Sequence, residues 1–275
     1  MGEGAPGRVV GGASRLVGED APRAAVEGAA RAVVIYGRQA VKEALRAARR
    51  PVTRVWATEG AAREGWLRGA PVTVEAAAAL ERRCGSRDHQ GVCADAGPYP
   101  YADAAALLAR PNPLLVVLDE VQDPQNLGAI CRTAEGAGAD AVVIPERRAA
   151  EVTPAVCRAS AGAVEHLAVA RVRNLADFLA DAKTAGCWCY GAAAGAPTAY
   201  DRVDLAGGVV LVLGAEGRGL RPRVAKACDA LVALPLKGRV ASLNVSATAA
   251  VLLYAAMQAR MQNPQRAVDR NPPHP

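Results

Sequence analysis

Hydrophobic and polar positions alternate along the chain with the periods of strands and helices, first between residues 32 and 97. Short β-branched runs alternate there with segments of helical period. Strands are predicted at 33–37, 54–58, 71–74 and 91–95, and helices at 38–49, 61–68 and 76–83. This order predicts a small α/β domain at 32–97.

A second alternation begins at Pro113, and its strands are apolar almost throughout. Continuous apolar runs are typical of strands covered on both faces, so we expect a largely parallel sheet. Strands are predicted at 114–119, 140–145, 187–192, 208–214 and 230–236, and helices at 127–137, 154–163, 175–184, 221–227 and 245–262. The pattern predicts a second α/β domain at 113–262, joined to the first by a Pro- and Tyr-containing linker at 98–112.

The two ends of the chain lack a sustained hydrophobic period. Residues 1–31 are rich in Gly, Ala and Arg, and residues 263–275 are rich in Pro, so both are predicted to be flexible tails. The start lacks the basic-then-apolar order of a signal peptide, and no apolar run reaches the roughly 18 residues of a membrane span. We therefore expect a cytoplasmic protein with no membrane partner.

The charge balance favours an anionic partner without deciding its kind. The chain has 33 Lys and Arg against 27 Asp and Glu, a net charge of +6. Most of the cations are arginine, whose planar fork suits phosphate, although an Arg-rich composition also arises from genomic base-composition bias. Nucleic acid therefore remains open on charge alone.

The seven cysteines are odd in number and scattered, which favours free thiols in a reducing compartment. Cys187 and Cys189 are too close for the usual zinc-ligand spacing, and no histidine lies nearby. No metal site is predicted.

Three polar clusters each follow a predicted strand of the second domain. They are LDEVQDPQNLGAICRTAEGAG (118–138), LVLGAEGRGL (211–220) and KGRVASLNVS (237–246). In an open α/β sheet, ligands bind beyond the carboxyl ends of the strands. We therefore expect the three clusters to converge on one crevice.

The first two clusters also have plain structural interpretations. Asn126 is predicted to cap the helix that carries Arg132, and a capping Asn beside a solvated Arg would explain both. Gly214 and Gly217 would let the backbone approach a ligand beside the Glu216 carboxylate, but a tight turn explains the glycines equally well.

The third cluster favours a functional site. A single helix cap accounts for one Ser or Asn, whereas Ser242, Asn244 and Ser246 stand together after a loop with Lys237 and Arg239. So many polar groups between an apolar strand and an apolar helix indicate ligand binding.

In this order, the three clusters resemble the SpoU family, also called TrmH-like, over about residues 33–262. These are RNA ribose 2′-O-methyltransferases that use S-adenosylmethionine. VVIYGRQAVKEAL (33–45) and HQGVCAD (89–95) further resemble the RNA-binding domain of the subgroup that methylates a guanosine of 23S rRNA. The resemblance implies a SPOUT-type α/β fold, with a trefoil knot in a parallel sheet behind a small α/β RNA-binding domain, and a homodimer.

The resemblance also implies roles for individual residues. The expected catalytic residues are Arg132, Asn126, Glu216, Ser242 and Asn244. The expected S-adenosylmethionine contacts are Gly214, Leu234, Leu243, Glu216, Gly217 and Pro235. Arg38, His89 and Gln90 are candidate RNA contacts, although a histidine such as His89 is more often a satisfied loop residue than an RNA contact.

Alternatives remain within and outside this activity. The substrate could be tRNA, or an rRNA adenosine as in resistance enzymes, and a non-enzymatic RNA-binding ribosome-assembly protein is a third possibility. The five polar site residues together argue against a protein that has lost catalysis. A nucleotide-dependent oxidoreductase is disfavoured because no G-x-G-x-x-G follows a predicted strand.

Overall fold

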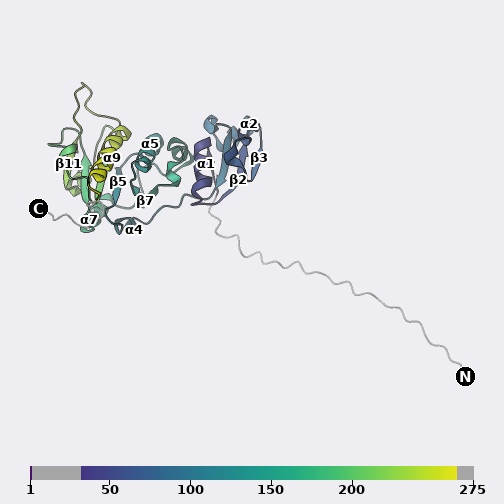
Figure 1. Ribbon diagram of the computed structural model, residues 1–275, viewed down its shortest axis with the longest axis horizontal. Helices are drawn as coiled ribbons and strands as arrows, with labels where there is room; N and C mark the ends of the chain where they lie inside the picture. Colours follow the sequence, from purple (N-terminus) through teal and green to yellow (C-terminus); the bar gives the residue numbers. More distant parts are fainter. Residues whose placement is uncertain (2–31, 265–275) are drawn as a thin grey trace. The chain divides into compact units, whose positions relative to one another are not determined.

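The computed structural model describes Met1 and residues 32–264 (Figure 1). The tails predicted at 1–31 and 263–275 therefore lie almost entirely outside the described residues. All features below belong to the compact unit that begins at Arg31.

The first domain is built on a four-stranded sheet with the order β1-β4-β2-β3. Strand β4 is antiparallel to both of its neighbours, and β3 pairs in parallel with β2 at the edge. The strands are β1 (Val33–Tyr36), β2 (Val52–Ala57), β3 (Val72–Val74) and β4 (Val92–Ala96). The helices are α1 (Arg38–Ala47), α2 (Glu59–Ala62) and α3 (Ala77–Cys84), with 3₁₀ turns η1 (Gly65–Leu67) and η2 (Arg87–His89).

The second domain carries a seven-stranded sheet with the order β7-β6-β5-β10-β8-β11-β9. Every pairing in it is parallel, as the continuous apolar runs predict. The strands are β5 (Leu114–Asp119), β6 (Ala141–Pro145), β7 (Ala168–Val172), β8 (Trp188–Ala192), β9 (Thr198–Ala199), β10 (Val209–Gly214) and β11 (Ala230–Ala233). The helices are α4 (Ala104–Leu108), α5 (Pro124–Gly136), α6 (Pro154–Ala159), α7 (Leu175–Thr184), α8 (Pro222–Ala227) and α9 (Val245–Gln262), with 3₁₀ turns η3 (Ala163–Glu165) and η4 (Tyr200–Arg202).

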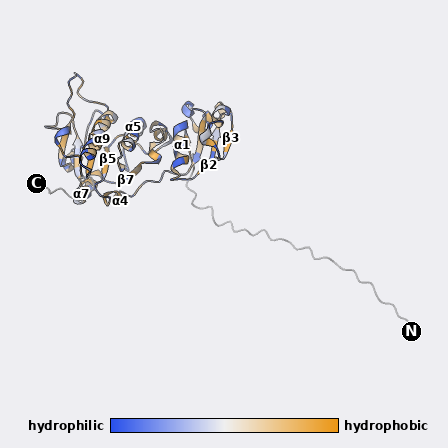
Figure 2. Cartoon of the chain, viewed as in Figure 1, coloured by the Kyte–Doolittle hydropathy of each residue, from blue (hydrophilic) through white to orange (hydrophobic). Residues whose placement is uncertain are grey.

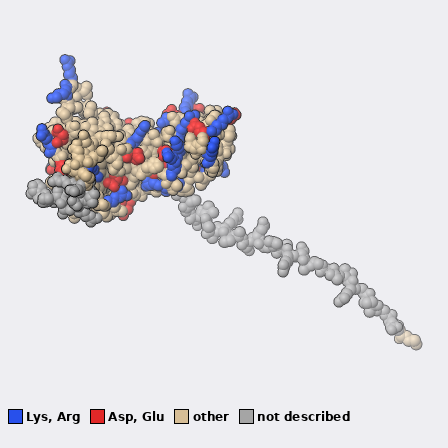
Figure 3. Space-filling view, in the orientation of Figure 1, with Lys and Arg blue, Asp and Glu red and all other residues tan. Residues whose placement is uncertain are grey.

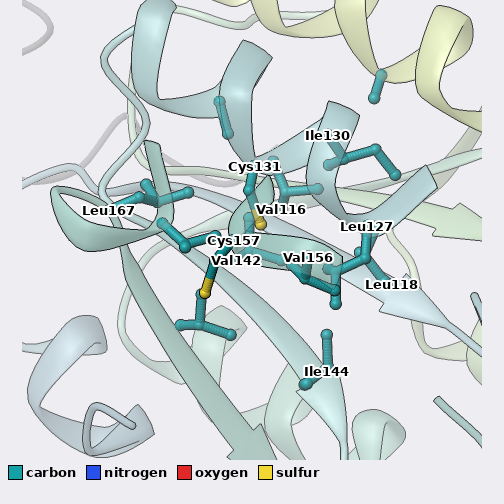
Figure 4. Packing of buried hydrophobic residues seen from close by; sticks show 14 of the residues in the cluster. Val116, Leu118, Leu127, Ile130, Cys131, Val142, Ile144, Val156, Cys157 and Leu167 are labelled. Atoms are coloured by element: carbon teal, nitrogen blue, oxygen red, sulfur yellow. The ribbon is translucent and has the colours of Figure 1, made fainter. Parts of the chain in front are cut away.

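Helices cover both faces of this sheet, so successive side chains of its central strands enter two separate cores. On β5, Val116 and Leu118 pack with α5, α6 and α9, whereas Leu115 and Val117 pack with α7 and α8. Figure 2 shows how the hydrophobic residues concentrate on the strands, and Figure 4 shows the first core from close by. The central strands are thereby fixed, and their carboxyl ends form a rigid edge.

Packing between α5 and α6 explains a glycine of the first cluster. A Cβ on Gly128 would lie 2.4 Å from the Cβ of Ala159 and 2.9 Å from the backbone nitrogen of Ser160. The two helices therefore approach more closely than any side chain at this position would allow.

Several local predictions differ from the structure. Strand β7 was not predicted, because it is short and Arg171 interrupts its apolar pattern. The helix predicted at 61–68 is two short turns, and the one predicted at 154–163 ends at Ala159, before Gly162 adopts a left-handed φ of 85°. Asn126 is not an N-cap, since Asp123 caps α5 by accepting the N–H of Gln125.

A buried polar contact joins the two domains. The Arg50 guanidinium forms an ion pair with Glu165, in which Nε donates to Oε2 at 3.1 Å, and Nη1 also donates to the carbonyl oxygen of Gly97 at 3.0 Å. The hydroxyl of Tyr99 lies 2.9 Å from the carbonyl oxygen of Val164. Because both charged side chains are almost fully buried, the ion pair depends on the two domains staying packed together.

Candidate active site

The three polar clusters lie at one edge of the parallel sheet, as expected. Strands β5 and β10 are neighbours, and their last residues, Asp119 and Gly214, are paired in register. Strand β11 lies beyond β8 on the same side of β10. Segments 120–126, 215–221 and 234–244 leave these strands at their carboxyl ends, where ligands bind in such sheets.

The larger of two cavities at this edge has a volume of about 560 Å³. It is lined by residues after β8, β10 and β11 and by the start of α9. Five of the six predicted cofactor residues line it, namely Gly214, Glu216, Gly217, Leu234 and Leu243. Pro235 does not, although its neighbours Leu234 and Leu236 do.

The smaller cavity, of about 260 Å³, adjoins the first. Its lining comes from 120–126, from the turn after β10 and from Val245. Ala215, Glu216 and Arg218 line both cavities, so the turn after β10 is their common wall.

Glycines allow this turn to fold tightly. Gly217 and Gly219 have left-handed φ angles of 78° and 68°, and the Gly219 N–H donates to the carbonyl oxygen of Ala215 at 2.8 Å. A Cβ on Gly214 would lie 2.1 Å from the carbonyl carbon of Gly219. The turn therefore lies directly on the end of β10.

Asn244 joins the first and third clusters. It is the N-cap of α9, and its Oδ1 accepts the N–H of Ser246 at 2.8 Å and the Ser246 hydroxyl at 2.6 Å. Its Nδ2 donates to Oδ1 of Asn126 at 3.0 Å. One side chain therefore caps the helix and links two segments that are 118 residues apart.

Among the predicted catalytic residues, Ser242 lines the larger cavity, Asn126 the smaller, and Glu216 both. Arg132 is exposed on α5 and lines neither. Its guanidinium forms no hydrogen bond or ion pair with any of residues 32–264. The sequence did not indicate Glu120, which lines the smaller cavity with a left-handed φ of 59°, nor the Asp119–Arg221 pair described below.

The candidate RNA contacts of the first domain are engaged with one another or with the backbone. Arg38 Nε donates to the carbonyl oxygen of Gln90 at 3.1 Å, and its guanidinium pairs with Glu64. His89 is buried, and its Nδ1 accepts the N–H of Gly91 at 2.9 Å. Arg38 keeps half of its side chain exposed, whereas His89 shapes the turn before β4.

Comparison with known families settles the chain's relationship. Residues 113–254 match the SpoU rRNA methylase family, and residues 34–102 match the substrate-binding domain of RNA 2′-O ribose methyltransferases. The chain belongs to the SpoU rRNA methylase family. It is an RNA 2′-O-methyltransferase that depends on S-adenosylmethionine, as the motifs predicted.

Curated RNA methyltransferases resemble the chain over most of its length. A 23S rRNA (guanosine-2′-O-)-methyltransferase of Pseudomonas syringae is 39% identical over 82% of this chain and 95% of that protein. An uncharacterized tRNA/rRNA methyltransferase of Synechocystis is 38% identical over 82% of this chain, which spans only 62% of that longer protein.

Solved RNA methyltransferase structures share the fold. The S-adenosylmethionine-bound rRNA methyltransferase of Sinorhizobium meliloti aligns with a TM-score of 0.70 and 26% identity, over 83% of this chain and 87% of that one. An RNA 2′-O ribose methyltransferase aligns with a TM-score of 0.71 and 27% identity, over 84% and 90%. The parallel-sheet fold with its preceding substrate-binding domain is confirmed, and the trefoil knot stays a prediction.

The larger cavity fits the cofactor of a SpoU enzyme. Its volume lies within the roughly 300–1,000 Å³ of small-molecule sites. Leucine side chains and backbone from the β10 and β11 segments line it, which suits a nucleoside with an apolar face and a hydrogen-bonding edge. Within residues 32–264, no cluster of three or more potential metal ligands occurs, and no helix is long and apolar enough to cross a membrane.

Proposed function

We propose that this protein methylates the ribose 2′-hydroxyl of a guanosine in 23S rRNA. The observation that carries the proposal is that the three polar clusters line two adjoining cavities in a chain that also has the substrate-binding domain. The Pseudomonas relative, which aligns across both domains, supports guanosine in 23S rRNA over tRNA. The predicted division at 32–97, 98–112 and 113–262 is part of this proposal.

RNA recruitment is proposed for the first domain. Figure 3 shows Lys and Arg gathered over this domain, and Arg54, Arg82 and Arg87 are exposed on it. Phosphate contacts of this kind give affinity that falls with salt. The exposed loop 235–244, with Lys237 and Arg239, would supply further cations beside the cavities.

The two cavities would bind different reactants, the larger one the cofactor and the smaller one the ribose. S-adenosylmethionine, when bound in the larger cavity by Gly214, Leu234 and Leu243, supplies an electrophilic methyl group. The linked amides of Asn126 and Asn244, with Glu216 and Ser242, would then hold the ribose hydroxyl. Positioning is worth about 7–11 kcal/mol and general-base help about 10²–10⁴-fold, so alignment should be the larger contribution.

Arg132 is proposed to bind the substrate phosphate and orient the hydroxyl. A guanidinium stays protonated in almost all proteins, which makes it a poor base and a good phosphate ligand. The helix that carries Arg132 packs beside α9. Along α9, Val251, Tyr254 and Met261 are exposed on one side. We propose that this side forms a homodimer interface and that Arg132 acts close to it.

Methyl transfer from radiolabelled S-adenosylmethionine to unmodified 23S rRNA and to tRNA tests the substrate. We expect label on one rRNA ribose, mapped by primer extension at low nucleotide concentration. Arg132→Ala should abolish it, while Arg110→Ala should leave it intact, because Arg110 pairs with Asp140 near the amino end of β5. Label only on tRNA would overturn the substrate, and full activity of Arg132→Lys would rule out both roles for Arg132.

A further inference from the structure

A buried carboxylate, Asp119, stands at the end of β5 and has no part in the proposed mechanism. The Asp119 side chain is fully buried, and Arg221 satisfies both of its oxygens. The Arg221 Nε donates to Oδ1 at 2.7 Å, and the Arg221 backbone N–H donates to Oδ2 at 2.8 Å. A buried charge is tolerated only with good partners, and here one residue supplies both.

The pair joins two of the three clusters. Asp119 directly precedes the segment that leads to Asn126, and Arg221 directly follows the turn that forms the common wall of the cavities. The chain leaves β10 at Gly214, folds over that strand's end and is held by Asp119 just before α8 begins. The wall is thus fixed at both ends, by the sheet and by this ion pair.

Glu120 adds a second carboxylate to the same guanidinium. Its backbone has a left-handed φ, which residues other than glycine rarely adopt. Its Oε1 lies 3.6 Å from Nη1 of Arg221 and 3.5 Å from Nη1 of Arg148. Glu120 also lines the smaller cavity. Arg221 therefore contacts both Asp119 and Glu120, and through Glu120 it connects the common wall to the lining of the smaller cavity.

We propose that Asp119 and Arg221 are positioning residues. Their ion pair sets the distance between the turn 215–220, which carries Glu216, and the segment 120–126, which ends at Asn126. The inference rests on the proposed function, because it is this separation that would align the ribose hydroxyl with the methyl donor. Neither Asp119 nor Arg221 lines either cavity, so the pair would act through the turn 215–220.

The test compares Arg221→Lys, Arg221→Ala and Asp119→Asn with wild type. Lysine keeps the charge and the backbone N–H but loses the guanidinium fork. We measure kcat and KM for rRNA at saturating S-adenosylmethionine, the cofactor's Kd by calorimetry, and the thermal midpoint. Arg223→Ala is the matched control, because Arg223 lies on α8 and pairs with Asp177 at the surface.

We expect kcat to fall about 10²-fold in Arg221→Ala, the loss that a misplacement of about 1 Å can cause, and less in Arg221→Lys. Kd for the cofactor should rise about fivefold or more, with KM for rRNA nearly unchanged. If the ion pair had only a structural role, its loss would lower the thermal midpoint and leave kcat of the folded protein unchanged.

The inference is overturned if folded Arg221→Lys and Arg221→Ala both keep wild-type kcat and Kd. If wild type itself transfers no methyl group to rRNA, the proposed function fails instead. The comparison of cofactor Kd values then still decides whether the pair positions the wall. Should Asp119→Asn fail to fold, the two Arg221 variants carry the test.

Discussion

At the scale of residues, the site depends on side chains that each hold two segments together. Asn244 caps α9 through its oxygen and contacts Asn126 through its nitrogen. Both roles use one side chain, so a substitution that changes only one end of the amide separates helix capping from the contact between clusters.

Asn244→Asp should preserve the cap and remove the donor to Asn126. Aspartate caps helices about as well as asparagine, so the thermal midpoint should stay near that of wild type. The Asn126 amide would have to turn its nitrogen toward the new carboxylate, which removes its present orientation, and methyl transfer should fall at least tenfold. Asn244→Ala should in addition lose about 1 kcal/mol of stability. Equal activity of Asn244→Asp and wild type would show that the Asn126 contact has no part in catalysis.

How far the sequence predicts the site also depends on the residue. Asn126, Glu216, Ser242 and Asn244 were predicted together because each follows a strand in a recognisable cluster, and their roles stay predictions. Arg132 belongs to the same cluster as Asn126, but it lies six residues further along the helix, which is a rotation of about 240°, so the two side chains leave the helix in different directions. Asp119 and Arg221 were missed because each looks ordinary alone, and only the fold brings residues 102 positions apart together.

At the scale of elements, the central helices and strands were predicted well and the edges less well. Apolar runs as long as 114–119 and 208–214 are typical of strands covered on both faces. Edge strands lack that signal, since β7 is partly exposed and β9 has only two residues. The first domain's helices are short, so weak local preference left their ends undetermined.

The contact of α5 with α6 can be tested by Gly128→Ala. The added Cβ would meet backbone of α6 that cannot move aside, because α6 also packs against the first domain. Overpacking of this kind typically costs about 1–3 kcal/mol, which urea unfolding would measure. Gly138→Ser is the comparison variant: the backbone φ of 73° strains the new side chain, but no neighbouring atom lies within reach of its Cβ. A Gly128→Ala protein as stable as wild type would contradict the close approach.

At the scale of the whole molecule, the two domains depend on each other through the buried Arg50–Glu165 pair. Arg50→Ala leaves a buried carboxylate without its partner. Removing one member of such a pair costs about 3–5 kcal/mol, and we expect that loss in urea unfolding. Arg63→Ala, which breaks an exposed pair on α2, should leave the unfolding midpoint unchanged. Independent unfolding of two domains, unaffected by Arg50→Ala, would refute the coupling.

Buried thiols make the molecule less stable in alkali. Burial raises the pKa of several cysteines from 9.0 to about 11 for Cys157 and Cys187, and to about 12 for Cys93, Cys131 and Cys228. Above pH 9 the unfolded chain therefore holds fewer protons than the folded one, so each such thiol lowers the free energy of unfolding by about 1.4 kcal/mol per pH unit until its folded pKa is reached.

Urea midpoints measured at pH 7, 8, 9 and 10 should accordingly be nearly constant to pH 8 and then fall. Cys131→Ala should reduce the slope above pH 9, since it removes one of the thiols. A midpoint that is unchanged from pH 8 to pH 10 would show that the thiols are not protected from titration.

The central claim is that this chain transfers a methyl group from S-adenosylmethionine to the 2′-oxygen of guanosine in 23S rRNA. The most direct measurement is mass spectrometry of nucleosides from 23S rRNA that lacks the modification, after incubation with the purified protein and the cofactor. The account predicts one new 2′-O-methylguanosine per rRNA molecule, and none when S-adenosylmethionine is left out. A methyl group on a base, on another nucleoside or on no nucleoside would contradict it.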